Sequence, residues 1–302
     1  MTTTTNISLT FDDAYDAHLD VVVPCLNEHL LPGTFYVDFL SRGLTRRSAE
    51  WRQAAHQGHE LGNHSLFHPG YLPALHVREG NSLAFYSLDR MSMELELANR
   101  LLTAIDGRSL RSFAYPNANP VLGDVGWAKR LLRLLGWDRT RLDGWVDRWG
   151  IDFGATRRNY RSVVERHFFA ARGGMVRELP STYDRYFVPS FSCDSKSLAE
   201  LLQVVDRVAQ TGSWGVLMFH NVGPSAEFSC DAGVFREFVS RLAGDPRIAV
   251  KTFIDAACDL WSPEGSRPMA SGNSDSDFSV RVDAQDSSIA AELATADQSA
   301  GH

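Results

Sequence analysis

Short apolar runs alternate along the chain with segments of helical spacing. Apolar runs of this length, closed by turn residues, are typical of strands, whereas apolar residues that recur every three or four positions predict amphipathic helices. The predicted strands are 7–11, 34–39, 112–115, 167–172, 215–220 and 248–253. The predicted helices are 17–29, 49–57, 92–105, 124–135, 197–211 and 234–242.

The repeated strand–helix units predict one α/β domain with a largely parallel sheet. They run without a linker from about residue 7 to residue 261, a usual length for a (β/α) barrel, so we expect a barrel-like domain within residues 1–262. The segment HELGNHSLFHPGY reads as a loop. Residues 137–160 carry three tryptophans among many charges and predict an insertion, in which the tryptophans either pack onto the barrel or form a substrate platform.

Residues 263–302 have a different composition from the rest of the chain. They are rich in Ser, Ala, Gly and Asp, and their seven acidic and two basic residues carry −5 of the net charge of −7. Too few large apolar residues are present to form a core, which predicts a disordered tail with a short helix near 288–295. An acidic interaction tail is the less favoured interpretation.

The composition excludes several classes of function. A net charge of −7 and a pI of about 5.8 leave no basic surface, so nucleic acid is a poor candidate partner. The four cysteines are widely spaced and predict buried residues rather than a disulfide framework. No run is apolar enough to span a bilayer, and MTTTTNIS lacks the pattern of a secretory signal. As written, the chain is expected in the cytoplasm, although a trimmed form of an exported protein would look the same.

Polar side chains follow several of the predicted strands. Asp12 and Asp13 come after the first strand, Asn117 follows FAYP, and His220 closes GVLMFH. In parallel α/β proteins the reacting groups gather where the carboxyl ends of the strands open. We therefore interpret these positions as one candidate site.

His64 and His68 add a possible metal site. Their spacing of four residues lets both imidazoles reach one ion, and one carboxylate would complete the ligand set of a catalytic zinc site with open positions for water. Each feature alone is commonly structural, because an Asp pair often caps a helix and a strand-terminal histidine is often an ordinary polar residue. Their order, at successive strand ends, favours a functional site.

The order TFDD, HxxxHP, FAYP, LxxH resembles the polysaccharide deacetylases with a NodB homology domain, carbohydrate esterase family 4. The similarity runs from about residue 7 to residue 261, and SLTFDDAYDAHLD, GHELGNHSLFHP and SFAYPNA are its most specific segments. The resemblance implies a distorted (β/α) barrel. It also implies that Asp13, His64 and His68 bind a divalent metal, usually Zn²⁺, with Co²⁺ or Ni²⁺ as substitutes.

The same resemblance assigns the remaining roles. Asp12 corresponds to the catalytic base and His220 to the general acid. Leu217 corresponds to the residue that lines the pocket for the acetyl methyl group, and the backbone N–H of Asn117 corresponds to an oxyanion donor. The fourth motif of the family is not clear, and Trp214 and Asp194 are candidates to border the pocket.

Tyr115, Tyr15 and His18 lie close enough in sequence to line the groove, although packing roles are as reasonable. The third motif departs from the family, because Ala114 stands where many members carry an arginine that orients the catalytic aspartate. We expect Arg172 to supply that guanidinium to Asp12 from a neighbouring strand. The alternative is an ordinary ion pair.

The resemblance implies a metal-dependent hydrolase that removes acetyl groups from a carbohydrate. A glycan that contains N-acetylglucosamine is the first choice of substrate, and an O-acetylated glycan such as xylan is the second. A hydrolase of small cyclic amides and a non-catalytic glycan-binding module are further hypotheses. Retention of the Asp12–Asp13 pair and both histidines argues against these two.

Overall fold

The computed structural model describes residues 4–71, 79–124, 156–176, 178–224 and 228–262. Contacts between Cα atoms group residues 1–267 into one compact unit and residues 268–302 into a second, which lies outside the described residues. The predicted tail at 263–302, and nearly all of the predicted helix at 124–135 and of the predicted insertion at 137–160, also fall outside them. Among the described residues, no helix is long and apolar enough to cross a membrane.

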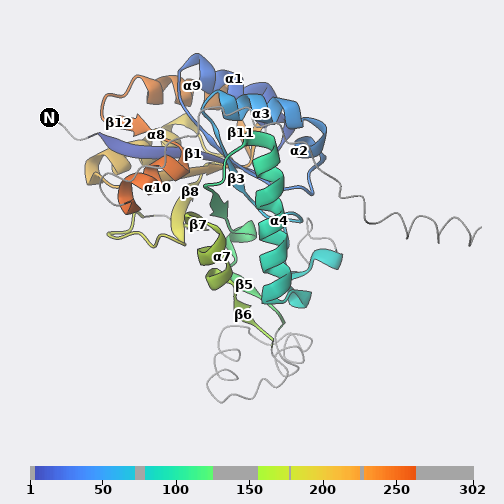
Figure 1. The fold of residues 1–302 in the computed structure, drawn as a ribbon. Coiled ribbons are helices and arrows are strands. Elements are labelled where there is room, and N and C mark those ends of the chain that lie inside the picture. Colours follow the sequence, from blue (N-terminus) through green and yellow to red (C-terminus); the bar gives the residue numbers. More distant parts are fainter. Residues whose placement is uncertain (1–3, 72–78, 125–155, 177, 225–227, 263–302) are drawn as a thin grey trace, which may run out of the picture. The chain divides into compact units, whose positions relative to one another are not determined.

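Among the described residues, seven parallel strands close into a barrel (Figure 1). In order around the barrel they are β1 (Thr5–Asp12), β2 (Thr34–Val37), β3 (Glu60–Asn63), β4 (Ser112–Ala114), β7 (Ala170–Met175), β8 (Val188–Ser192) and β9 (Gly215–Phe219), which pairs back with β1. The predicted (β/α) barrel is therefore confirmed.

The barrel is distorted at β1, where one edge is shared by two partners. Strand β12 (Ile248–Val250) pairs with the start of β1, at Thr5–Ile7, whereas β2 pairs with its end, at Thr10–Asp12. Two small two-stranded sheets lie outside the barrel: β5 (Val121–Leu122) with β6 (Arg158–Asn159), and β10 (Asn221–Gly223) with β11 (Ser229–Asp231).

Helices follow most of the strands. They are a π-helical turn η1 (His18–Val22), α1 (Val23–Glu28), α2 (Arg42–Arg46), α3 (Ser48–His56), α4 (Leu88–Asp106), α7 (Arg161–His167), α8 (Leu198–Thr211), α9 (Ala232–Ala243) and α10 (Phe253–Trp261). Three short 3₁₀ turns are η2 (Glu79–Asn81), η3 (Leu83–Phe85) and η4 (Pro116–Ala118).

The bounds of the two longest of these helices follow from their capping residues. The Ser87 hydroxyl accepts a hydrogen bond from the backbone N–H of Arg90 and starts α4, and a capping box of Ser197 with Glu200 starts α8. Each of the two helices ends at a glycine in the left-handed region, Gly107 and Gly212, where a side chain would be strained.

Side chains alternate between the inside and the outside of the barrel along β1. Leu9 and Phe11 are fully buried in the main apolar cluster with residues of the surrounding helices. Thr10 and Asp12 point the other way, because both contact Arg172 of β7, which lies across the interior rather than beside β1. The interior is thus polar at the carboxyl end of the strands.

The amino end of the barrel is closed by the first turn of α10. The backbone N–H of Phe253 donates to Thr34 Oγ1 at 2.8 Å, and that of Ile254 donates to Glu60 Oε2 at 2.9 Å. Phe253 also packs in an apolar cluster with Trp214. Among the described residues, the first turn of α10 thus covers the amino ends of β2 and β3.

Three local predictions were wrong. The loop predicted at 59–71 begins with β3, whose four residues ELGN are too short and too polar to read as a strand alone. The strand predicted at 167–172 starts only at Ala170, because Val163 and Val164 bury one face of α7 before it. The strand predicted at 248–253 stops at Val250, since Thr252 caps α10.

Candidate active site

The carboxyl ends of three strands bring the predicted site residues together. Asp12 ends β1 and Asp13 follows it, His64 follows β3 directly, and His220 follows β9 directly. Strands β1 and β9 are paired up to Phe11 and Phe219, so Asp12 and His220 are the next residues on adjacent strands.

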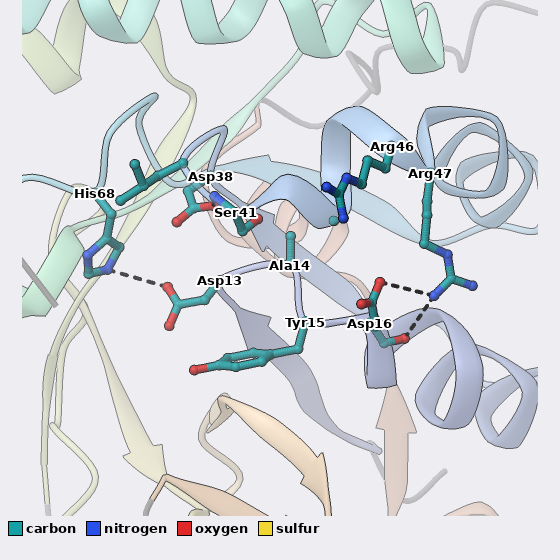
Figure 2. Close-up of a pocket in the computed structure, with 11 residues that line it drawn as sticks. Asp13, Ala14, Tyr15, Asp16, Asp38, Ser41, Arg46, Arg47 and His68 are labelled. Atoms are coloured by element: carbon teal, nitrogen blue, oxygen red, sulfur yellow. Dashed lines mark hydrogen bonds and ion pairs between the residues drawn. The ribbon is translucent and has the colours of Figure 1, made fainter.

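Asp13, His64 and His68 form a compact group of potential metal ligands. Asp13 Oδ1 lies 3.4 Å from His68 Nε2 (Figure 2). The same oxygen lies 3.5 Å from His64 Nε2, and one ligand atom from each of the three residues lies within 4.8 Å of the other two. The three residues could hold a metal ion. One carboxylate oxygen and two imidazole nitrogens suit zinc and similar divalent ions in an open catalytic site.

His64 is fixed in the form that a metal ligand requires. Its Nδ1–H donates to the carbonyl oxygen of Ala114 at 2.8 Å, which leaves the lone pair of Nε2 directed at the group. Burial lowers the pKa of His64 to about 3, so the ring is neutral at physiological pH. A neutral imidazole is the metal-binding form.

The loop that carries both histidines is held by α4. Glu94 Oε1 of α4 accepts a hydrogen bond from the backbone N–H of Phe67 at 3.2 Å. Within the loop, Asn63 Oδ1 accepts from the N–H of Ser65 at 2.7 Å, and Ser65 Oγ accepts from the N–H of His68 at 3.0 Å. These bonds fix the backbone between the two histidines.

Asp12 is a buried carboxylate with one engaged oxygen. Its Oδ2 accepts a hydrogen bond from Arg172 Nη2, and Arg172 Nη1 donates to Thr10 Oγ1 at 3.2 Å. Burial alone would raise the pKa of Asp12, but the charge and hydrogen bond of Arg172, with the charge of His220, outweigh it and lower that pKa. The other oxygen, Oδ1, has no hydrogen-bond partner among the described residues. The structure thus brings Arg172 onto Asp12, as expected from the sequence.

His220 is held by Asp194, a residue for which the sequence suggested only a place at the pocket border. His220 Nδ1–H donates to Asp194 Oδ2 at 2.5 Å, and the backbone N–H of His220 donates to Asp194 Oδ1 at 3.0 Å. Burial would lower the pKa of His220, but the bond to Asp194 and the charge of Asp12 raise it to about 9. The ring is therefore protonated at neutral pH. Asp194 lies just beyond the end of β8, a strand that the sequence did not predict, so the strand-end rule used for His220 was not applied to it.

The backbone of His220 is fixed from the π-helical turn η1. His18 Nε2–H donates to the carbonyl oxygen of His220 at 2.6 Å. His18 is fully buried, and burial lowers its pKa to about 4, so the ring is a neutral donor. This residue was expected to line the groove and instead is buried and supports the backbone of His220.

Two side chains predicted to contact substrate are buried elsewhere. Tyr115 packs among the rings of Phe113, Tyr160 and Phe187, because its strand position faces the helices. Trp214 precedes β9 and lies at the closed amino end, where its Nε1 donates to Ser8 Oγ at 3.0 Å. The prediction placed Trp214 near the site from sequence proximity to His220, but a strand separates the two.

Leu217 also faces away from the site. It lies in the main apolar cluster between barrel and helices, in register with Leu9. Because side chains alternate along a strand, the residue on the same face as His220 is Met218, which is in register with Thr10 of the interior. The prediction that Leu217 lines the pocket is therefore wrong.

Asn117 lies in η4, three residues beyond Ala114, whose carbonyl group holds His64. Its backbone is in the left-handed region, with φ of 54°. Its side chain is exposed, and its role as an oxyanion donor stays a prediction.

Unusual backbone conformations concentrate around the site. Non-glycine residues with positive φ carry strain that the surrounding structure must maintain, and such strain is common at functional sites. Among the described residues, Leu30 is the one such residue remote from the site. The others belong to segments that carry or contact site residues: Asp13, Ala14, Ser65, His68, Asn117, Ala118, Ser195 and Phe228.

A cleft of about 570 Å³ opens beside the potential metal ligands. Asp13 and His68 lie at one end, and Arg46 and Arg47 lie at the other (Figure 2). Asp38 borders it near His68, and its pKa is raised to about 6 by burial and by the neighbouring Asp13. A volume of this size is typical of small-molecule sites.

Comparison with protein families agrees with the site. Residues 2–129 match the family model described as polysaccharide deacetylase, and this stretch contains both aspartates and both histidines of the site. This part of the chain is similar to the polysaccharide deacetylases. No curated protein matches the chain.

The chain is also similar to solved structures. A putative polysaccharide deacetylase from Mycobacterium smegmatis matches with a TM-score of 0.52 at 16% identity, over 86% of this chain and 91% of that one. PdaA from Bacillus subtilis, a family 4 carbohydrate esterase, gives 0.47 at 14% identity over 86% and 83%. A family 4 acetyl xylan esterase from Clostridium thermocellum, solved with a cobalt ion, gives 0.47 at 15% identity over 84% and 91%.

Proposed function

We propose that the protein is a metal-dependent hydrolase that removes acetyl groups from a carbohydrate, with glycans that contain N-acetylglucosamine as the first substrate class. The observation that carries this proposal is the convergence of five side chains at the carboxyl end of the barrel. Asp13, His64 and His68 offer a metal-ligand set within 4.8 Å, and Asp12 and His220 end the adjacent strands. The fold alone would not support an activity, because one fold hosts many functions.

Asp13, His64 and His68 would hold the divalent ion, with zinc as the first choice and cobalt or nickel as substitutes. When bound, such an ion supplies Lewis-acid polarisation of an acyl carbonyl and lowers the pKa of a water molecule. A neutral His64 and a partly exposed carboxylate of Asp13 fit this role.

Asp12 is proposed as the general base. Its lowered pKa keeps it ionised, and Oδ1, which is buried and has no hydrogen-bond partner among the described residues, would accept a proton from a water molecule. Arg172 occupies the other oxygen and so fixes the direction from which the proton arrives. We propose Arg172 as a positioning residue that acts through Asp12.

His220 is proposed as the general acid. Its Nδ1–H is committed to Asp194, so Nε2 is the atom that would deliver a proton to the leaving group. An amine is a poor leaving group without that proton, whereas an alcohol leaves more easily. The backbone N–H of Asn117 is the proposed donor to the developing oxyanion, a contribution of about 3–4 kcal/mol in comparable enzymes.

The test is acetate release from chitin oligomers and from acetylated xylan, with and without a chelator. Wild-type protein is expected to release acetate from at least one of them, to lose the activity with chelator and to regain it with added zinc. Asp12→Asn is expected to be inactive. Asp89→Asn, the same change at an exposed position of α4, is the matched control and should behave as wild type. Activity that survives the chelator would overturn the metal-dependent mechanism, and activity on neither glycan would overturn the proposed substrate class.

A further inference from the structure

Two adjacent arginines of the cleft have different surroundings. Arg47 contacts three carboxylates: Asp16 at 3.2 Å, Asp20 at 2.6 Å and Glu50 at 2.5 Å. Arg46, the last residue of α2, lines the same cleft and has no ion pair or hydrogen bond among the described residues. Its side chain is exposed, and Figure 2 shows its guanidinium on the cleft side of α2, toward Ala14.

The carboxylates of the cleft are already engaged. Asp16 contacts Arg47, and Asp13 contacts both histidines of the metal-ligand group. Asp38 Oδ1 accepts a hydrogen bond from the backbone N–H of Ser41 at 2.9 Å. A free guanidinium therefore faces a cavity in which no described acidic side chain binds it, and its donors remain for a ligand.

The position of Arg46 relative to the reacting groups is fixed by close packing. Helix α2 lies against the turn that follows Asp13, and a Cβ atom added at Gly43 would come within 2.5 Å of the carbonyl oxygen of Ala14. Only a glycine permits this approach without a shift of the helix. Arg46 is thus carried on an element that docks directly beside the candidate active site.

We propose that Arg46 binds a carboxylate group of the substrate, so that the preferred substrate is an acidic acetylated glycan. This inference rests on the proposed deacetylase function and names its substrate more closely. A guanidinium presents planar paired donors that match a carboxylate, and it stays charged at all physiological pH values. The cleft holds the acetyl-bearing sugar near Asp13 and a carboxylate-bearing group at the Arg46 end.

The experiment measures binding separately from catalysis. Neutral chitin oligomers and the same oligomers oxidised at C6 to carboxylates are titrated by calorimetry into zinc-loaded Asp12→Asn protein. Acetylated xylan and acetylated glucuronoxylan form a second matched pair. The carboxylated member of a pair is expected to bind about 10–100-fold more tightly, the range given by hydrogen bonds to a charged group. High salt should reduce this preference.

Arg46→Gln in the same background is expected to abolish the preference and to leave binding of the neutral oligomer within about twofold, while Arg46→Lys should keep only part of it. Arg236→Gln, the same change at an exposed arginine of α9 that does not line the cleft, is the control and should keep the full preference. Thermal unfolding of each variant verifies folding.

Equal binding of both oligomers, binding of neither, or a preference that survives Arg46→Gln would overturn the inference. Acetate release by wild type is measured in parallel. Absent release with a preference that depends on Arg46 would overturn the proposed function and leave the carboxylate site standing.

Discussion

A buried carboxyl group at each end of the barrel, Asp12 at one and Glu60 at the other, allows a reactive group to be compared with a structural one. Asp12 at the carboxyl end and Glu60 at the amino end both have 4% of their surface exposed. Burial raises the pKa of Glu60, whose oxygens accept hydrogen bonds from Thr34, Ser112 and the N–H of Ile254. At Asp12 a guanidinium reverses the effect of burial on the pKa, and one oxygen is left open. Two equally buried carboxyl groups therefore have pKa shifts in opposite directions, and the residues that contact each group determine the direction.

The largest effect is expected from a substitution of Asp12, with Glu60 as the comparison. Asp12→Asn removes the proposed base and should lower kcat/KM for acetate release by about 10²–10⁴-fold, the usual contribution of general base catalysis. It also leaves the buried Arg172 without its counter-charge, so the free energy of unfolding should fall by about 3–5 kcal/mol. Glu60→Gln is the matched control: its amide keeps an acceptor oxygen at the closed end, and kcat/KM should stay within about threefold of wild type. Equal losses in the two variants would show that Asp12 has only a structural role.

The second effect concerns the proton that His220 is proposed to donate. The pKa of His220 is raised to about 9, so a general acid in this position is lost as the pH rises through about 9. Asp194→Asn removes the bonded charge, so the pKa of His220 should fall, while the charges of Asp12 and Asp13 still oppose the effect of burial. The alkaline limb of the kcat/KM profile should move to lower pH by about one pH unit or more, with lower activity at pH 8.5. An unchanged profile would contradict the assignment of His220.

The same raised pKa makes a stability prediction. The folded-state pKa of His220 lies above its unfolded value, so its contribution to stability is complete below about pH 6.5 and disappears as the pH rises to about 9. Urea unfolding of wild type across this window, with Asp194→Asn beside it, measures the contribution. The variant should lack this part of the pH dependence.

A smaller effect is expected at Glu94, which supports the histidine loop from α4. Glu94→Leu removes the acceptor for the N–H of Phe67 and should weaken zinc affinity about 10-fold, as for other residues that position metal ligands. Glu94→Gln keeps an acceptor oxygen and should restore most of the affinity. Zinc affinity is measured by competition with a chromophoric chelator. If the Leu variant loses stability but binds zinc as wild type does, the loop does not depend on Glu94.

The smallest effect tests the closed end alone. Thr252 Oγ1 accepts a hydrogen bond from the N–H of Asp255 and caps α10. Thr252→Ala should lower the free energy of unfolding by about 1 kcal/mol, the typical value of an N-cap. Activity per folded molecule should be unchanged, because this end contacts no site residue. A loss of kcat/KM larger than about threefold would show that the two ends are coupled.

The sequence predicted the residues whose place depends on where a strand ends. It did not predict which face of a strand a residue occupies. Polar residues at the ends of apolar runs identified Asp12, Asp13 and His220 as neighbours, because parallel strands open at a common edge. Leu217 was misplaced because motif spacing does not state which face of a strand a residue occupies. Trp214 was misplaced because it lies at the start of its strand rather than at the end.

The contacts that tune the site were less visible in the sequence. The approach of Arg172 to Asp12 crosses the barrel interior, and its prediction depended on the missing arginine at Ala114 rather than on any local pattern. Asp194 follows an apolar run, as the other strand-end residues do. The strand before it was not predicted, so Asp194 was not recognised as a residue at a strand end. The short strand β3 depends on pairing with β2 and β4, which no local pattern encodes.

The π-helical turn at His18–Val22 has a consequence for how this scaffold tolerates change in length. Such a turn holds one residue more than an α-helical turn, so deleting one residue from it would relax the segment into a regular helix at little cost to its own hydrogen bonding. That deletion would also rotate His18 by about 100° about the helix axis, away from the carbonyl group it holds. A one-residue deletion at this point would therefore keep the hydrogen bonding of the turn but lower the rate of turnover.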